Sequence, residues 1–335
     1  MREQLGVWLK DRWRYERALC GPEERLLGLC NRLETLDPAP EGLGYSCRWA
    51  FTSQLHAPKV QPRLGQRLLQ RCLEHAPIVR STIPPLSQRD PQISVLIGHR
   101  GLERLPLLSI TLESLAAQLH VRFECLVIEH DTSVTIADHL PAWVRHVHDV
   151  TEPDTPYNRS QAFNVGALHA KAPVLLLHDN DMLVPAEYLY RILHRLSLGY
   201  AVVNPKRYVF YLSQSHTQAL LSDETDLSLY PPESIVQNLE AGGSMAITRV
   251  AYNELGGMDE SFVGWGGEDN EFWDRCLTLP TWIWGYEPIV HLWHSSQPAK
   301  SQFKNPNLDL LSDKLKLPVA VRIASLIGKS RTASF

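Results

Sequence analysis

The sequence predicts an α/β protein with a layered sheet flanked by helices. The run ISVLI at residues 93–97 is short, apolar and β-branched, as buried parallel strands are. Similar apolar runs follow it in alternation with helix-like segments, which is the pattern of βαβ units. Two of these runs end in acidic residues, at 129–131 and 179–181. Ligands of such sheets bind beyond the carboxyl ends of the strands, so these acids are candidates for a site.

The residues before this sheet are expected to be mostly helical. Residues 1–36 predict helices because leucines recur at near-helical spacing and Pro22 is followed by two glutamates, a good helix start. Residues 37–61 are rich in proline and glycine and give no clear assignment. Residues 62–76 predict another helix, and the proline-rich stretch 77–92 predicts a linker.

From residue 93 onward, strands and helices are expected to alternate. In chain order we expect a strand at 93–97, a helix at 104–119, strands at 123–131 and 144–150, a helix at 159–171 and a strand at 174–181. The segment AGGSMAITRVAYNELGGMDESF then predicts a strand, a helix at about 248–255 and a Gly-Gly stop, and a last helix is expected at 268–277. The chain should therefore comprise a helical region with a linker (1–90), an α/β domain (91–300) and a partly helical tail (301–335).

The composition indicates an ordinary globular protein. Of 335 residues, 44% are hydrophobic and 21% are charged, and the formal net charge of −4 gives no general attraction to nucleic acid. The six cysteines contain no C-x-x-C pair, which favours reduced cysteines in a cytoplasmic protein. The N-terminus lacks the apolar core of a signal peptide, and no run of about 18 apolar residues predicts a membrane span.

The stretch HDND places Asp179 and Asp181 just after a run of four apolar residues. At a strand end, an extended D-x-D can direct its carboxylates at a hard divalent cation, which a nucleotide diphosphate requires. Aspartate and asparagine are also common turn formers, so an ordinary strand-to-loop turn is the competing interpretation. The position after a buried strand leaves these two interpretations evenly balanced.

The stretch VHLWH holds His291 and His294, three residues apart in a region rich in tryptophan. Neutral imidazoles can complete a coordination sphere that carboxylates begin. From the residues alone, however, a pair of partly buried histidines in an aromatic region is the better interpretation.

The stretch GWGGED combines three glycines and Trp265 with Glu268 and Asp269. The glycines permit backbone conformations closed to other residues and allow a loop to swing. The two acids would lie in the first turn of a helix, where the helix dipole favours them. That structural role does not explain Trp265, because an aromatic on a mobile loop is costly unless it stacks on a ligand, and sugars offer flat C–H faces. Upstream, Gly242 and Gly243 could let the backbone approach a ligand.

Four blocks stand in order between residues 93 and about 298. They are SVLIGHRG, YNRSQAFNVGALHAKAPVLLLHDNDMLVP, AGGSMAITRVAYNELGGMDESFVGWGGEDNEF and VHLWHS. With these blocks the segment resembles glycosyltransferases of the A-type (GT-A) fold, in particular β-1,4-galactosyltransferases and bacterial chondroitin-polymerase-type domains. The third block is the most specific, although Gly98-His99-Arg100 in the first departs from the Pro-Phe-Arg-type start of the animal enzymes. The resemblance implies a Rossmann-like nucleotide-diphospho-sugar transferase fold, with a mixed sheet flanked by helices and the N-terminal region as an appendage.

The resemblance also implies roles for the matching positions. Asp269 would be the general base on the acceptor hydroxyl, and Glu268 would bind the acceptor or donor sugar. Trp265 would lie on the loop that closes over them. Gly243 and Gly267 would line the substrate site, Asp181, His294 and His291 would hold Mn²⁺ or Mg²⁺, and Asp179, Arg100, Glu129 and Arg159 would lie near the nucleotide sugar.

These roles predict a metal-dependent inverting transferase that moves a hexose, of galactose or N-acetylhexosamine type, from a UDP-sugar to a glycan or lipid-linked acceptor in bacterial polysaccharide synthesis. Inverting transfer needs a base, a cation for the departing diphosphate and a closed pocket. A retaining transferase of the polypeptide N-acetylgalactosaminyltransferase type is the nearest competing function, although its metal motif is D-x-H. A non-catalytic sugar- or nucleotide-binding protein and a zinc hydrolase also stay open.

Two regions keep open roles. Residues 1–90 could recognise the acceptor or mediate oligomerisation, although a helical buttress packed on the sheet is preferred. The tail LKLPVAVRIASLIGKS carries basic residues among apolar ones and could contact the inner face of a membrane, where lipid-linked acceptors reside. Docking on its own domain is the preferred interpretation, and the expected location is the cytoplasm.

Overall fold

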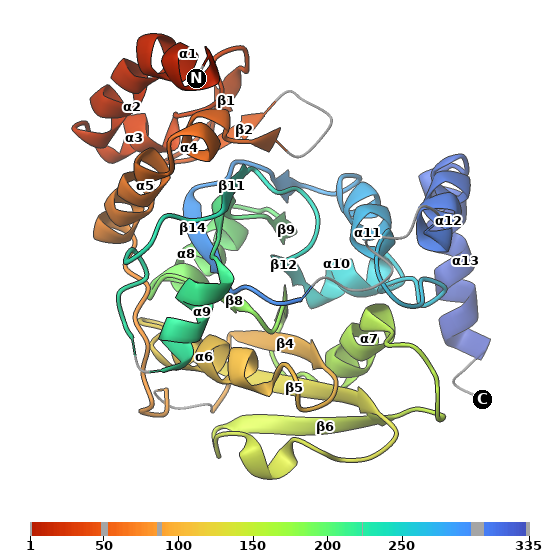
Figure 1. Ribbon diagram of the computed structural model, residues 1–335. Helices are drawn as coiled ribbons and strands as arrows, with labels where there is room; N and C mark the ends of the chain where they lie inside the picture. The colour runs from red at the N-terminus through yellow and green to blue at the C-terminus, as the bar shows by residue number, and fades with distance from the viewer. Residues whose placement is uncertain (1, 48–52, 86–88, 223, 296–304, 333–335) are drawn as a thin grey trace.

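The structure is a computed structural model that describes residues 2–47, 53–85, 89–222, 224–295 and 305–332. In Figure 1 the N-terminal helices lie at one end of an α/β body, and the two C-terminal helices lie on its other side. Parts of the predicted linker (86–88), the last residues of the predicted α/β domain (296–300) and parts of the predicted tail (301–304 and 333–335) lie outside the described residues.

The body contains a seven-stranded mixed sheet in the order β13-β9-β12-β7-β4-β5-β6. Strands β4 to β7 of this sheet run parallel, and β12 pairs antiparallel to both β7 and β9. The predicted mixed α/β sheet is confirmed. The strands are β4 (Ile93–His99), β5 (Phe123–Asp131), β6 (Val144–Val150), β7 (Val174–His178), β9 (Val202–Val203), β12 (Ser244–Thr248) and β13 (Thr281–Trp282).

Helices cover both faces of this sheet, which explains why its central strands are apolar throughout. Side chains alternate along a strand, so Val95 and Ile97 of β4 enter one core while Leu96 enters the other. Leu108 packs in the first core and Phe163 in the second. The helices of the body are α6 (Leu105–Ala116), α7 (Arg159–His169), α8 (Tyr188–Ser197), α9 (Gln214–Leu221), α10 (Arg249–Glu254) and α11 (Glu268–Cys276), with a 3₁₀ turn at Ala137–His139.

A second, five-stranded sheet has the order β3-β11-β10-β14-β8. The sequence did not predict these strands, because most of them are too short to show a period. Strand β14 pairs antiparallel with β8, and this pairing sets His291 opposite Met182. The end of β14 therefore lies beside the residue that follows Asp181. The strands are β3 (Ser53–Gln54), β8 (Met182–Leu183), β10 (Lys206–Tyr211), β11 (Ser234–Gln237) and β14 (Glu287–His291).

The N-terminal region is mostly helical, but its early helices are shorter than expected. Helix α3 begins after Pro22 as predicted, yet it ends at Leu27, and Leu36 already belongs to a strand. The helix predicted up to residue 36 is therefore wrong beyond 27. The elements are α1 (Arg2–Lys10), α2 (Arg12–Leu19), α3 (Glu23–Leu27), β1 (Leu36–Pro38), β2 (Tyr45–Cys47), α4 (His56–Val60) and α5 (Pro62–His75).

The body itself accounts for the early end of α3. The buried guanidinium of Arg207 donates hydrogen bonds to the carbonyl oxygens of Leu27 (2.6 Å) and Leu29 (2.8 Å). The hydroxyl of the neighbouring Tyr208 donates to the Leu29 carbonyl at 2.6 Å. Carbonyls at a helix end need such partners, and β10 supplies them from inside the core. The N-terminal region therefore packs against the second sheet as a buttress does.

The described part of the tail forms two helices, α12 (Pro306–Leu315) and α13 (Val319–Thr332), which pack near α11. Lys314 pairs with Asp259 at 2.6 Å, and Arg322 pairs with Glu271 at 2.7 Å. These ion pairs dock the tail on the α/β body. Among the described residues, no helix is both long and apolar enough to cross a membrane.

Candidate active site

Asp181, His291 and His294 form a compact group between the two sheets. Their ligand atoms all lie within 4.8 Å of one another. Nε2 of His294 lies 3.4 Å from Oδ2 of Asp181, and Nε2 of His291 lies 3.7 Å from Oδ1. The pairing of β14 with β8 produces this proximity, which no local sequence pattern could specify.

This group fits a divalent cation. Oδ1 of Asp181 is buried and has no hydrogen-bond partner among the described atoms, so it has a free lone pair facing the imidazoles. Burial lowers the pKa of His294, which keeps the ring neutral. Its Nδ1 lies 2.8 Å from the Ser295 carbonyl and 2.9 Å from Nη2 of Arg104, and its Nε2 is the nitrogen near Asp181, where a metal would bind. Carboxylate and imidazole ligands together suit ions such as Mn²⁺.

Two residues before Asp181, Asp179 binds a different partner. Nε and Nη2 of Arg159 donate to Oδ1 of Asp179 at 3.0 and 2.6 Å. The Asp179 amide donates to the Gly243 carbonyl at 2.8 Å, and Gly243 has a φ of +73°. The positive φ favours glycine at this position, and a Cβ there would also displace the terminal methyl group of Met182, which would lie 2.7 Å away.

Arg159 links the D-x-D segment to the GWGGED segment. Its Nη1 donates to Asp269 and lies 3.8 Å from Oε1 of Glu268. Arg159 is the first residue of α7, and its guanidinium lies over the Phe163 ring at 4.6 Å from the centroid. One side chain thus contacts three carboxylates that arrive from two distant segments of the sequence.

Glu268 and Asp269 open helix α11 after Gly267, which has a φ of +91°. Burial, with the neighbouring Asp269 carboxylate, raises the pKa of Glu268 to about 7. Burial also raises the pKa of Asp269, an effect that Arg159 opposes. On the other side, a Cβ at Gly242 would lie 2.7 Å from Oδ2 of Asp269, so the backbone approaches this carboxylate closely. The pair therefore has the raised basicity that suits proton transfer.

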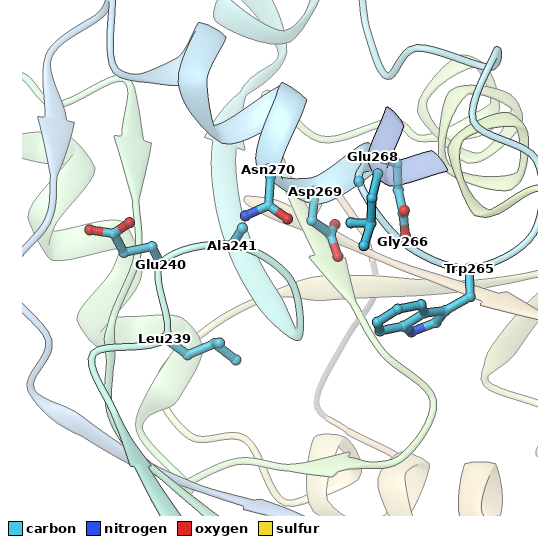
Figure 2. Close-up of a pocket in the computed structure, with 10 residues that line it drawn as sticks. Leu239, Glu240, Ala241, Trp265, Gly266, Glu268, Asp269 and Asn270 are labelled. Atoms are coloured by element: carbon cyan, nitrogen blue, oxygen red, sulfur yellow. The ribbon is translucent and has the colours of Figure 1, made fainter. Parts of the chain in front are cut away.

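A cavity of about 280 Å³ lies beside this pair (Figure 2). Its size is close to the lower end of the range for small-molecule sites, which is roughly 300 Å³. Figure 2 shows Asp269 and the Trp265 indole bordering the same space, while the Glu240 carboxylate points away from Asp269. Trp265 is 38% exposed, which leaves part of its ring able to contact a ligand. The cavity is lined by Leu239, Glu240, Ala241, Trp265, Gly266, Gly267, Glu268, Asp269, Asn270 and Leu308.

The start of α12 holds the glycine–tryptophan loop. Nδ2 of Asn305 donates to the Trp265 carbonyl at 3.0 Å, and Nδ2 of Asn307 donates to the Val263 carbonyl at 3.0 Å. A Cβ at Gly267 would lie 2.9 Å from the Asn307 carbonyl oxygen. This contact was not predicted from the sequence, although Asn-Pro-Asn at 305–307 is a good signal for a helix start.

Two residues expected near the nucleotide lie apart from this cluster. Arg100 donates to the Thr155 carbonyl at 2.6 Å. Glu129 is fully buried; its Oε1 accepts from the Thr135 amide at 2.7 Å, and its Oε2 lies 2.7 Å from Nε2 of His146. In this geometry Glu129 supports the loop after β5, and its contact with a nucleotide stays a prediction. A nucleotide contact by Arg100 stays a prediction.

Two basic side chains near the site carboxylates were not predicted from the sequence. Nη1 of Arg104 lies 3.4 Å from Oδ2 of Asp181. Nζ of Lys206, on β10, is buried and donates to the Ser244 carbonyl at 2.7 Å. Burial lowers the pKa of Lys206 to about 7, against the attraction of the Asp269 and Asp179 charges. A lysine in an apolar strand gives no local sign that its charge faces a distant carboxylate.

Two protein families match parts of the chain. Residues 102–249 match the family described as glycosyl transferase family 2, and residues 236–281 match the one described as N-terminal domain of galactosyltransferase. The first match includes Arg159 and the D-x-D segment, and the second includes the GWGGED segment. No curated protein matches the chain. These two matches and the mixed sheet show a glycosyltransferase with the A-type fold, in which residues that match family 2 are followed by residues that match the galactosyltransferase domain.

Proposed function

We propose that the chain is a metal-dependent inverting transferase that moves a hexose from a UDP-sugar to a hydroxyl group of a glycan or lipid-linked acceptor. One observation carries the proposal most directly. Arg159 contacts both Asp269, the proposed base, and Asp179, which lies two residues from the proposed metal ligand Asp181, so one guanidinium connects the two proposed parts of the site. The donor would lie on the metal side and the acceptor in the cavity.

Asp269 is the proposed general base. Its carboxylate accepts the proton of the acceptor hydroxyl while that oxygen attacks the anomeric carbon from the face opposite the nucleotide. The bond from that carbon to the diphosphate breaks, and the electron pair leaves with the nucleotide. The raised pKa of Asp269 supports this role, because burial makes the carboxylate a better proton acceptor.

The departing diphosphate needs positive charge. A divalent cation held by Asp181, His291 and His294 would neutralise the negative charge that develops on the leaving group. Arg104 places a guanidinium beside the same carboxylate and adds to the positive charge there. Asp179 fits a contact to the donor sugar or ribose, since it lies two residues from Asp181 and is oriented by Arg159.

The cavity fits one sugar unit of the acceptor. The partly exposed Trp265 ring offers a flat surface for the C–H face of a hexose. Oε2 of Glu268 is buried beside the cavity without a hydrogen-bond partner among the described atoms, so a sugar hydroxyl can bind it. Closure of the glycine–tryptophan loop over this sugar would exclude water, which competes with the acceptor.

A donor screen tests the proposal. Purified protein is incubated with Mn²⁺, one of several UDP-sugars and candidate acceptors, and released UDP is measured beside the Asp269→Asn protein. Acceptor-dependent release by the parent alone supports the proposal, and NMR of the product should show an inverted anomeric centre. Retained configuration would instead indicate a retaining transferase. Tight UDP-sugar binding without turnover would indicate a binding protein, and zinc-dependent hydrolysis without a nucleotide sugar would indicate a hydrolase.

A further inference from the structure

The first two helices present an apolar surface that the rest of the described chain leaves open. It consists of Leu5, Trp8, Leu9 and Trp13, exposed by 56%, 52%, 57% and 58%, and is here named the α1–α2 patch. Only Val7 of helix α1 is buried. Surface helices normally turn their large apolar side chains toward the core. The reversed arrangement in α1 indicates a partner outside the described chain.

The patch continues onto helix α4. Leu5 and Trp8 border a shallow hollow of about 380 Å³ together with Val60 and Gln61. The side chain of Gln61 reaches the Gln4 carbonyl at 3.4 Å, which helps to hold α1 against α4. At Leu5 and Trp8 the apolar surface therefore extends from α1 to the end of α4.

Positive charge without local compensation surrounds the patch. Arg2, Lys10 and Arg17 are exposed, and they form no ion pair within the described residues. Glu3 is the one acid of this helix pair that stays unpaired there. The other two acids of the pair already have partners, Asp11 with Arg14 at 3.6 Å and Glu16 with Arg67 at 2.7 Å.

This combination of apolar and basic side chains favours a bilayer surface over a second copy of the chain as the partner. Tryptophans and leucines flanked by lysine and arginine are typical of helices that lie in the headgroup region of a bilayer. Anionic lipids attract the basic side chains, and the indole rings fit the boundary between headgroups and acyl chains. A second copy of the patch would bring like charges together, which disfavours a symmetric dimer through this face.

The tail is a weaker candidate for such a contact. Its basic residues Lys314 and Arg322 are held by Asp259 and Glu271 of the body. Figure 1 also shows α1 and α2 at the outer edge of the N-terminal region, away from α12 and α13. We infer that the α1–α2 patch docks the protein on a membrane surface that carries anionic lipids.

Vesicle binding tests the inference with the full chain. Sedimentation is measured with vesicles of phosphatidylcholine mixed with phosphatidylglycerol, and with phosphatidylcholine alone. The parent should bind the anionic vesicles more tightly, and added salt should weaken the binding. The double variant Trp8→Ala/Trp13→Ala should lose at least about tenfold in vesicle affinity, since both rings leave the interface. Lys10→Glu should also weaken binding, but only to anionic vesicles.

Matched controls separate this surface from exposed apolar residues elsewhere on the protein. Leu168→Ala removes a side chain that is 84% exposed on α7, and Leu317→Ala removes an exposed one from the tail; both should bind vesicles as the parent does. Circular dichroism melting should match the parent for every variant. Equal vesicle binding by the Trp8→Ala/Trp13→Ala protein would overturn the inference. So would an absence of vesicle binding together with a concentration-dependent dimer, seen by light scattering, that this double variant abolishes.

Discussion

Arg159 and Asp269 form an ion pair that joins the first residue of α7 to the first turn of α11. The same guanidinium donates to Asp179 at 2.6 Å, so the proposed base and the donor-side carboxylate share one cation. The proton affinity of the proposed base therefore depends on a residue that also holds Asp179, the carboxylate proposed to face the donor.

Arg159→Met should move the acidic limb of the pH–rate profile to higher pH. The guanidinium lowers the pKa values of Asp269 and Glu268, so its loss raises both and leaves the base protonated at a pH where the parent is active. A lost charge partner at this distance corresponds to a shift of about 1–3 pH units. The profile of kcat is the readout, with the exposed Arg122→Met as control. An unshifted limb would show that Arg159 does not tune the base.

Asp269→Asn should lower turnover by about 100-fold or more while UDP and metal binding persist, because only proton removal is lost. Turnover is followed by UDP release and binding by calorimetry. Asp274→Asn is the matched control, since Asp274 lies on the same helix but pairs with Arg322 away from the cavity. Near-parental turnover of the Asp269 variant would remove this residue from the base role.

Asp181→Ala should abolish metal-dependent UDP binding. The substitution removes the one carboxylate of the Asp181, His291 and His294 group, and the loss should exceed the roughly 10–100-fold that outer-sphere changes cause. A chelator should stop turnover of the parent, and added Mn²⁺ should restore it. The exposed Asp313→Ala serves as control. Calorimetry that finds unchanged UDP affinity with Mn²⁺ would contradict the ligand assignment.

Trp265→Ala should impair acceptor use more than hydrolysis of the donor by water. The ring borders the proposed acceptor cavity, whereas Asp179, on the proposed donor side, is held by Arg159 independently of it. Both rates are measured by UDP release, with and without acceptor. Asn307→Ala should give a milder form of the same defect, because it frees the Val263 carbonyl of the loop. Equal losses of both rates would indicate a structural tryptophan.

Glu287→Gln should change how stability depends on pH. Burial raises the pKa of Glu287 to about 7 in the folded protein, whereas the unfolded value is near 4.5. Between pH 4.5 and about 7, the Glu287 carboxyl keeps a proton in the folded state that it loses in the unfolded state. Its contribution to the free energy of unfolding is therefore greatest below about pH 4.5 and declines as the pH rises to about 7. Relative to the parent, the variant should gain roughly 1–3 kcal/mol of unfolding free energy between pH 4.5 and 8. Urea unfolding at several pH values measures this, with the exposed Glu254→Gln as control. Parallel plots of unfolding free energy against pH for the parent and the variant would contradict the raised pKa of Glu287.

Local patterns were sufficient to predict the parallel half of the sheet. Strands β4 and β5 are short apolar runs buried on both faces, and that chemistry is visible in any window of the sequence. Helix α11 and its acids were predicted for the same reason, since glycines followed by acids mark a helix start. The extended helix beyond residue 27 was wrong because Arg207, far along the chain, takes the carbonyls that a longer helix would use.

The sequence by itself determined the order of strands and helices, the acidic strand end and the glycine–tryptophan loop, because each rests on neighbouring residues. Only the tertiary structure decided which of these groups meet. The register of β14 on β8 brings His291 to Asp181, and the position of α7 lets Arg159 reach both Asp179 and Asp269. Contacts between distant segments depend on sheet pairing and core packing, which leave no periodic pattern in the sequence.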